Sequence, residues 1–230
     1  MSQIIAQIEH IRNEIRAAQN RSPYASKDVL LLAVTKNVDV DRIKAAIGAG
    51  LTALGENRVQ EIMQKYDKIP DHISWHLIGH LQTNKVKYII DKVSLIHSLD
   101  SVNLAKEINK RAQKAGRVMP VLVQVNVADE ETKFGLPTED TVDFIKEVKD
   151  MPYIKISGLM TIGPLVADEE EVRPIFKELR LLRDKIKQME LPGVAMDYLS
   201  MGMTNDYRVA VEEGSNIVRI GSAIFGARTN

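Results

Sequence analysis

The stretch that decides the fold is Val29-Leu-Leu-Leu-Ala-Val34-Thr-Lys36, an unbroken apolar run that ends in polar residues. Its six apolar residues are too few for a helix and are typical of a strand buried on both faces. Residues 39–50 follow with helical spacing and stop at Gly50, where a helix commonly ends. A buried strand followed directly by a helix is the repeating unit of parallel α/β folds.

The same alternation continues to the end of the chain. Seven more strand-like runs occupy residues 52–55, 73–78, 94–97, 119–126, 154–159, 196–200 and 216–220. Amphipathic stretches or helical turns follow them at residues 57–68, 82–92, 101–115, 138–150, 169–190, 204–213 and 222–226. An extra helix over residues 3–18 precedes the first strand, because its isoleucines form one apolar stripe at spacings of three and four.

Eight strand–helix units without a Ser/Gly/Pro-rich linker predict one α/β domain over residues 1–230. Strands that alternate with helices pair in parallel through right-handed crossovers. The count predicts a single (β/α)8 TIM barrel with an extra N-terminal helix, a fold that typically needs about 250 residues. The rival is an open doubly wound sheet, which would favour a Gly-rich first turn that Ala33-Val-Thr-Lys36 does not provide.

Composition excludes several classes of function. Lys and Arg number 31, Asp and Glu also number 31, and Cys is absent. A nucleic-acid binder would normally show a basic excess, so no nucleic-acid partner is expected. Without Cys there is no disulfide or thiolate site, and no apolar run of about 18 residues is present to cross a membrane. The first residues lack the apolar core of a secretory signal, which predicts a cytoplasmic protein, and we expect a monomer.

Chemistry in such a barrel belongs at the carboxyl ends of the strands, where Lys36 ends the first one. An amine at the end of a buried strand lies in a low dielectric that favours its neutral form, which can attack a carbonyl. The alternatives are that Lys36 extends to solvent or pairs with Glu56.

Small-residue turns follow the last two strands. Ser200-Met-Gly-Met-Thr204 and Gly221-Ser222 each lead into a predicted helical segment, and exposed N–H groups beside hydroxyls can bind a phosphate. Barrels commonly bind phosphate after these two strands. The alternative is that Gly202 and Gly221 are ordinary turn glycines.

Arg219 lies two residues before the second of these turns and is predicted to face the barrel interior. There it would need an acceptor, because an unpaired buried charge is costly. It either forms a structural ion pair with Glu212, Glu213 or Asp197, or donates to a nitrogen of a heterocyclic ligand. No metal site is predicted, since His76 and His80 lack an obvious carboxylate partner.

Together these motifs resemble the pyridoxal phosphate homeostasis protein family. The matching stretches span nearly the whole chain: Ala33–Lys36, Gly55–Asn57, His76–Lys85, Lys133–Gly135, Gly158–Met160, Ser200–Thr204 and Val218–Gly226. The resemblance implies a barrel like the first domain of bacterial alanine racemase and a pyridoxal 5′-phosphate (PLP) cofactor held as an internal aldimine on Lys36. It further implies that the phosphate is bound by Ser200, Thr204, Gly221 and Ser222. Arg219 would face the pyridine nitrogen, and Asn57 would lie near the ring.

The resemblance also implies a function that is not catalytic. An Arg at the pyridine nitrogen leaves it largely unprotonated, so the cofactor is a weak electron sink. A racemase also needs a second acid/base, which in alanine racemases is a Tyr from another domain. We therefore predict a PLP-binding protein of vitamin B6 homeostasis with no catalytic residues, which releases PLP to apo-enzymes or free amino acids. The alternatives are a weakly active PLP-dependent amino-acid racemase and a Schiff-base aldolase acting on a sugar phosphate.

Overall fold

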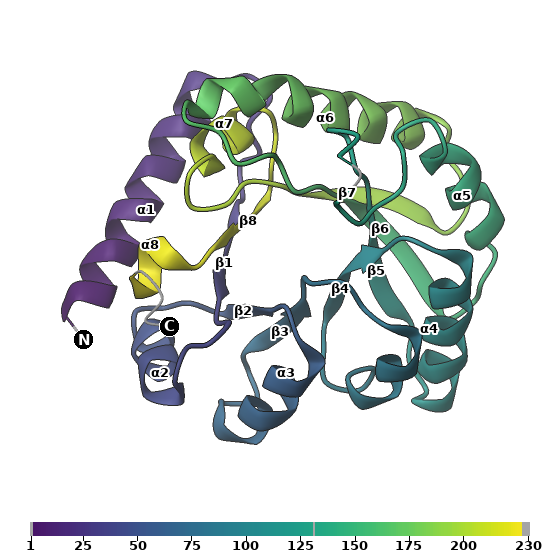
Figure 1. Ribbon diagram of the computed structural model, residues 1–230, viewed down its shortest axis with the longest axis horizontal. Coiled ribbons are helices and arrows are strands. Elements are labelled where there is room, and N and C mark those ends of the chain that lie inside the picture. The colour runs from purple at the N-terminus through teal and green to yellow at the C-terminus, as the bar shows by residue number, and fades with distance from the viewer. Residues whose placement is uncertain (1, 131, 227–230) are drawn as a thin grey trace.

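The computed structural model describes residues 2–130 and 132–226. Eight parallel strands pair in chain order, and β1 also pairs with β8, so the sheet closes into a barrel. Figure 1 shows the helices as an outer ring around these strands. The predicted (β/α)8 barrel is confirmed, and the alternative of an open doubly wound sheet is wrong.

The strands match the predicted apolar runs. They are β1 Leu30–Val34, β2 Ala53–Glu56, β3 Ser74–Leu77, β4 Leu95–Leu99, β5 Met119–Gln124, β6 Ile154–Met160, β7 Val194–Ser200 and β8 Ile217–Ile220. The α-helices are α1 Ser2–Arg21, α2 Val40–Gly48, α3 Val59–Lys65, α4 Val102–Lys114, α5 Thr141–Val148, α6 Arg173–Gln188, α7 Tyr207–Glu212 and α8 Ser222–Phe225. Three short 3-10 helices complete the list: η1 Tyr66–Lys68, η2 Thr83–Tyr88 and η3 Glu169–Val172.

The extra N-terminal helix is confirmed as α1. Its isoleucine stripe is buried, and the helix packs against α2, α7 and α8 on the outside of the barrel (Figure 1). None of the helices in the described part of the chain combines the length and apolar character needed to cross a membrane.

The amphipathic stretch predicted over residues 82–92 forms helical turns and not a regular α-helix. That segment is the 3-10 helix η2 followed by turns. Gln82 makes no side-chain cap at its start, so nothing favours a regular α-helical first turn. Val86, Ile89 and Ile90 are nevertheless buried, so the apolar spacing that predicted a helix is satisfied by a shorter structure.

Alternate residues of each strand face the barrel interior. Leu30, Leu32 and Val34 of β1 pack in the interior cluster, whereas Leu31 and Ala33 pack toward the helices. The interior also holds Ala53, Ile78, Leu95, Leu122, Met160 and Ile217. Because side chains alternate with a period of two, an extended backbone continued past Val34 would place Lys36 on the interior side, although β1 itself ends at Val34.

Candidate functional site

A cavity of about 760 Å³ opens at the carboxyl ends of the strands, within the usual size range of ligand sites. We call it the main cavity. Five of the seven predicted site residues line it, namely Asn57, Thr204, Arg219, Gly221 and Ser222. They come from loops after β2, β7 and β8 and from β8 itself, as the barrel rule predicts.

Arg219 is buried in the barrel interior, as predicted. One guanidinium nitrogen donates to Ser200 Oγ at 2.7 Å and the other to the Thr161 carbonyl at 2.7 Å. Burial lowers the pKa of Arg219 to about 10, so the guanidinium stays charged at neutral pH. Since a guanidinium has five N–H donors, three of them have no partner among the described residues, and Arg219 lines the main cavity.

Among the described residues Arg219 forms no ion pair with Glu212, Glu213 or Asp197, so that alternative is wrong; Asp197 lines a different cavity. Glu212 is bound by Arg21 and Arg173, and Glu213 is bound by Arg173 and Arg180. Among the residues that the structure describes, the carboxylate whose charge acts on Arg219 is Asp206, which also lines the main cavity. Burial raises the pKa of Asp206.

Behind Arg219 runs a chain of buried hydrogen bonds that sequence reasoning missed. Ser200 Oγ lies 2.9 Å from His97 Nδ1, and His97 Nε2 lies 3.0 Å from His76 Nδ1. Arg219 can only donate, so Ser200 Oγ accepts from it. A neutral His97 donates from one ring nitrogen and accepts at the other, so its bonds to Ser200 and His76 point the same way along the chain. We call Ser200, His97 and His76 the histidine relay.

Both histidines of the relay are neutral at pH 7. Burial lowers the pKa of His76 to about 4, and burial together with the charges of His76 and Arg219 holds the pKa of His97 well below its usual value. A neutral imidazole has one donor and one acceptor nitrogen, which is what the directed chain requires. The signal was present in the sequence, because both histidines lie in apolar strands.

The two small-residue turns meet at the main cavity. Ser222 Oγ donates to Thr204 Oγ1 at 3.1 Å, which joins the turn after β8 to the turn after β7. Gly202 has a φ of +91°, and a Cβ there would lie 2.5 Å from that of Ala210. This glycine is therefore required by the close packing of α7 on the turn.

Lys36 lies in a turn directly after β1 and is half-buried. It does not appear among the described residues that line the main cavity, but Val34, two residues earlier on the interior side, does. Pairing of Lys36 with Glu56 is wrong: Glu56 Oε1 accepts from Lys65 Nζ at 2.7 Å, and Glu56 Oε2 is buried without a partner among the described residues. Burial raises the pKa of Glu56.

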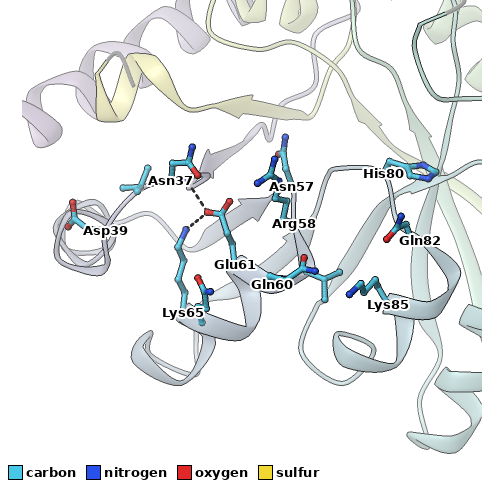
Figure 2. A pocket seen from close by; sticks show the side chains of 13 residues that line it. Asn37, Asp39, Asn57, Arg58, Gln60, Glu61, Lys65, His80, Gln82 and Lys85 are labelled. Atoms are coloured by element: carbon cyan, nitrogen blue, oxygen red, sulfur yellow. Dashed lines mark hydrogen bonds and ion pairs between the residues drawn. The ribbon is translucent and has the colours of Figure 1, made fainter. Parts of the chain in front are cut away.

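A second cavity of about 810 Å³ lies beside the first, on the side of β1, β2 and α3. Figure 2 shows this side cavity, with Glu61 and Lys65 on its wall. Asn57 lines both cavities. Its Oδ1 is buried without a hydrogen-bond partner among the described residues, so this atom remains available to a ligand donor.

The remaining polar candidates have other partners. His80 lies 3.3 Å from Asp100 and stacks on Phe134, so His76 and His80 do not act together. Within the described residues, no cluster of three His, Asp or Glu side chains is arranged to hold a metal. Lys133 lines the main cavity and is bound to Glu130 and the Gly163 carbonyl.

Comparison with known proteins identifies the family. The alanine racemase N-terminal domain family matches residues 7–229 of this chain. A pyridoxal phosphate homeostasis protein of Aquifex aeolicus is 45% identical over 222 residues, which cover 96% of each chain. The chain belongs to the pyridoxal phosphate homeostasis protein family. A family member from Schizosaccharomyces pombe is 37% identical, with 99% of this chain and 94% of that one covered.

Solved structures agree with this assignment to the pyridoxal phosphate homeostasis protein family. The structure of PipY from Synechococcus elongatus, solved with PLP bound, has a TM-score of 0.84 and 30% identity, and covers 97% of this chain and all 100% of that one. An alanine racemase from Clostridium difficile has a TM-score of 0.75 at 18% identity, and this chain spans 57% of it. The racemase likeness shows a shared barrel fold.

Proposed function

We propose that this protein binds PLP in the main cavity and holds it in reserve for other proteins. The observation that carries the proposal is Arg219, a buried cation with free N–H donors at the floor of a cavity of ligand size. Hydrogen bonds fix this guanidinium from behind, so it is a permanent donor. An aromatic nitrogen that accepts without being protonated, such as the pyridine nitrogen of PLP, fits such a donor.

The rest of the cavity suits the other groups of PLP. Thr204 and Ser222 offer hydroxyls and Gly221 an unencumbered backbone for the phosphate. Asn57 Oδ1, which has no partner in the described chain, is available to a donor near the ring. For Ser200, whose hydroxyl is bound to Arg219 and His97, we propose a role in holding Arg219 in place of a phosphate contact.

Lys36 is our proposed point of covalent attachment. When bound, PLP supplies an aldehyde that reacts reversibly with amines. Lys36 is two residues beyond Val34 on the interior side of β1, so its amine follows the strand toward the main cavity. Lys133 also lines this cavity and is the rival attachment point, but Glu130 and the Gly163 carbonyl hold its ammonium.

The same residues favour a carrier over a catalyst. Arg219 leaves the pyridine nitrogen unprotonated, which makes the bound cofactor a weak electron sink. Among the described residues that line the main cavity there is no Tyr, the residue that alanine racemases use as second acid/base. We propose that apo-enzymes or free amino acids take PLP from this protein, and that the protein acts as a monomer in the cytoplasm.

The visible absorption spectrum of the purified protein tests this proposal. We expect a yellow protein whose visible band disappears in Lys36→Ala and persists in both Lys133→Ala and Lys85→Ala, the latter altering a lysine of the side cavity. Borohydride reduction followed by peptide mapping should place the label on Lys36. A label on Lys133 in the parent protein would move the attachment point, and a PLP titration that produces no band would refute PLP attachment altogether.

A further inference from the structure

Three charged side chains meet beneath the turn that carries Lys36. The ammonium of Lys65 donates to the Thr35 carbonyl at 2.7 Å, to Glu56 Oε1 at 2.7 Å and to Glu61 Oε2 at 2.8 Å. All three of its N–H donors are thereby used. Glu56 is fully buried and Lys65 is 8% exposed. The cluster is thus part of the interior, unlike a mobile surface ion pair.

The turn itself spans residues 35–38, and we call it the Lys36 turn. Its closing hydrogen bond runs from the Val38 N–H to the Thr35 carbonyl at 3.0 Å. Lys36 and Asn37 are the central residues, and Asn37 has a φ of +59°, in the left-handed region that Asn tolerates better than most residues. A turn of this kind after a short strand has few backbone bonds of its own to hold it.

Side chains of α3 hold the Lys36 turn on both sides. Glu61 Oε2 accepts from the Asn37 N–H at 2.8 Å (Figure 2), and Lys65 binds the Thr35 carbonyl. The peptide groups just before and just after Lys36 are therefore both fixed. Glu56 supports the arrangement from β2 by also accepting from the Thr35 hydroxyl at 2.6 Å.

We propose that Glu56, Glu61 and Lys65 form a clamp that fixes the Lys36 turn and so positions the Lys36 amine for attack on an aldehyde. The clamp rests on the proposed role of Lys36 in holding PLP. In the step that it serves, the Lys36 nitrogen bonds to the aldehyde carbon of PLP, both amine protons leave with the carbonyl oxygen as water, and no electrons are exchanged with another reactant. The three clamp residues are positioning residues, since they act through the backbone of the turn.

The clamp lies outside the main cavity, so its effect on the position of Lys36 can be measured separately from PLP binding. Glu61 and Lys65 line the side cavity, and none of the three clamp residues is among the described residues of the main cavity. Loss of the clamp should therefore slow bond formation, because misplacement of a reacting group by about 1 Å can cost 100-fold in rate. It should not alter the binding of PLP by Arg219 and the two small-residue turns after β7 and β8.

The test uses the PLP-free full-length protein in a stopped-flow mixing experiment with PLP. For Glu61→Ala, we expect the visible band to grow about 10-fold more slowly than in the parent. The dissociation constant for 4-deoxypyridoxine 5′-phosphate, an analogue without the aldehyde, should stay within about twofold of the parent value. Glu61→Gln keeps an acceptor for the Asn37 N–H and should recover most of the rate. Gln60→Ala, on the same helix and the same cavity wall, is the matched control.

A second measurement does not involve PLP. Amide hydrogen exchange at Asn37 in the PLP-free protein should be faster in Glu61→Ala and in Lys65→Met than in the parent. Glu61 is 14% exposed at its side chain, so its variant should fold even where Lys65→Met does not.

Two outcomes would overturn the clamp. One is a parental rate of band growth in Glu61→Ala, and the other is a parallel loss of rate and of analogue affinity, which would indicate general damage to the barrel. Absence of any band in the parent protein would instead refute the proposed function.

Discussion

The two halves of the barrel mouth use their polar groups in opposite ways. On the side of β7 and β8, Arg219 has three N–H donors without a partner among the described residues, and the hydroxyls of Thr204 and Ser222 face the main cavity. On the side of β1 and α3, Lys65 uses all three of its donors within the protein. The first half is built to receive a ligand and the second to hold the backbone still.

The energetics of the two halves differ accordingly. A buried ion pair adds little net stability, because desolvation offsets the attraction, but removal of one partner is costly. The clamp therefore fixes the geometry of the Lys36 turn but adds little to the free energy of unfolding. The clamp also holds a buried acceptor without a partner among the described residues, Glu56 Oε2, which is unfavourable, whereas no Arg219 nitrogen is among the buried polar atoms that lack a described partner.

A fall in pH should test this comparison most strongly, because the clamp and the histidine relay bound to Arg219 respond to pH differently. In the clamp the pKa of Glu56 is raised and that of Glu61 is lowered, so their effects on stability oppose each other as pH falls. In the histidine relay both pKa values are lowered. The unfolded state then binds protons more readily than the folded state, and stability is lost as pH falls below the ordinary histidine value.

For His76 the window runs from its unperturbed pKa of 6.5 down to about 4. Across it we expect His76 alone to remove about 3 kcal/mol from the free energy of unfolding. Urea unfolding at pH 7 and pH 4 measures this loss, with His76→Gln as the comparison, because its amide can still hydrogen-bond to His97 and does not titrate. The variant should lose about 3 kcal/mol less than the parent over the same interval, and an equal loss in both proteins would contradict the lowered pKa of His76.

Removal of Arg219 should have the next largest effect. Hydrogen bonds to charged groups contribute about 1.5–3 kcal/mol, so Arg219→Met should weaken PLP binding by about 10- to 150-fold. Arg208→Met is the matched control, since Arg208 is also an arginine held by hydrogen bonds, but its partners are Glu14 and Glu169 and it does not line the main cavity. A titration of PLP-free protein measures both. Equal affinities in the two variants would mean that Arg219 does not face the ligand.

Most of the fold could be predicted from local pattern, because strands buried on both faces leave continuous apolar runs. Leu30–Val34 is such a run, and it forms β1 of the barrel, as predicted. For residues 82–92 the apolar spacing predicted a helical stretch but not its type, since spacing alone does not distinguish an α-helix from a 3-10 helix with turns. The polar residues at the strand ends, in turn, singled out Lys36, Arg219 and the two small-residue turns.

What the sequence did not reveal were partners far apart along the chain. His97 and Ser200 are 103 residues apart, and Thr35 and Lys65 are 30 apart. No local pattern connects such residues. The Glu61–Lys65 spacing is visible on α3, but a pair at this spacing is common on exposed helix faces. Only the closed barrel shows that Lys65 turns inward to the Lys36 turn.

The smallest predicted effect concerns a single hydroxyl on the side of β7 and β8. Ser222 Oγ is exposed and bound to Thr204, so Ser222→Ala should leave the barrel intact. A neutral hydrogen bond is worth about 0.5–1.5 kcal/mol, and its loss should weaken PLP binding by about 2- to 12-fold. The rate of band growth at saturating PLP should be unchanged, because the clamp and Lys36 are untouched. Ser94→Ala, which alters an exposed serine just before β4 at the opposite end of the barrel, is the control. A slower rate with unchanged affinity would reverse the assignment of the two halves, since Ser222 would then act on positioning and not on capture.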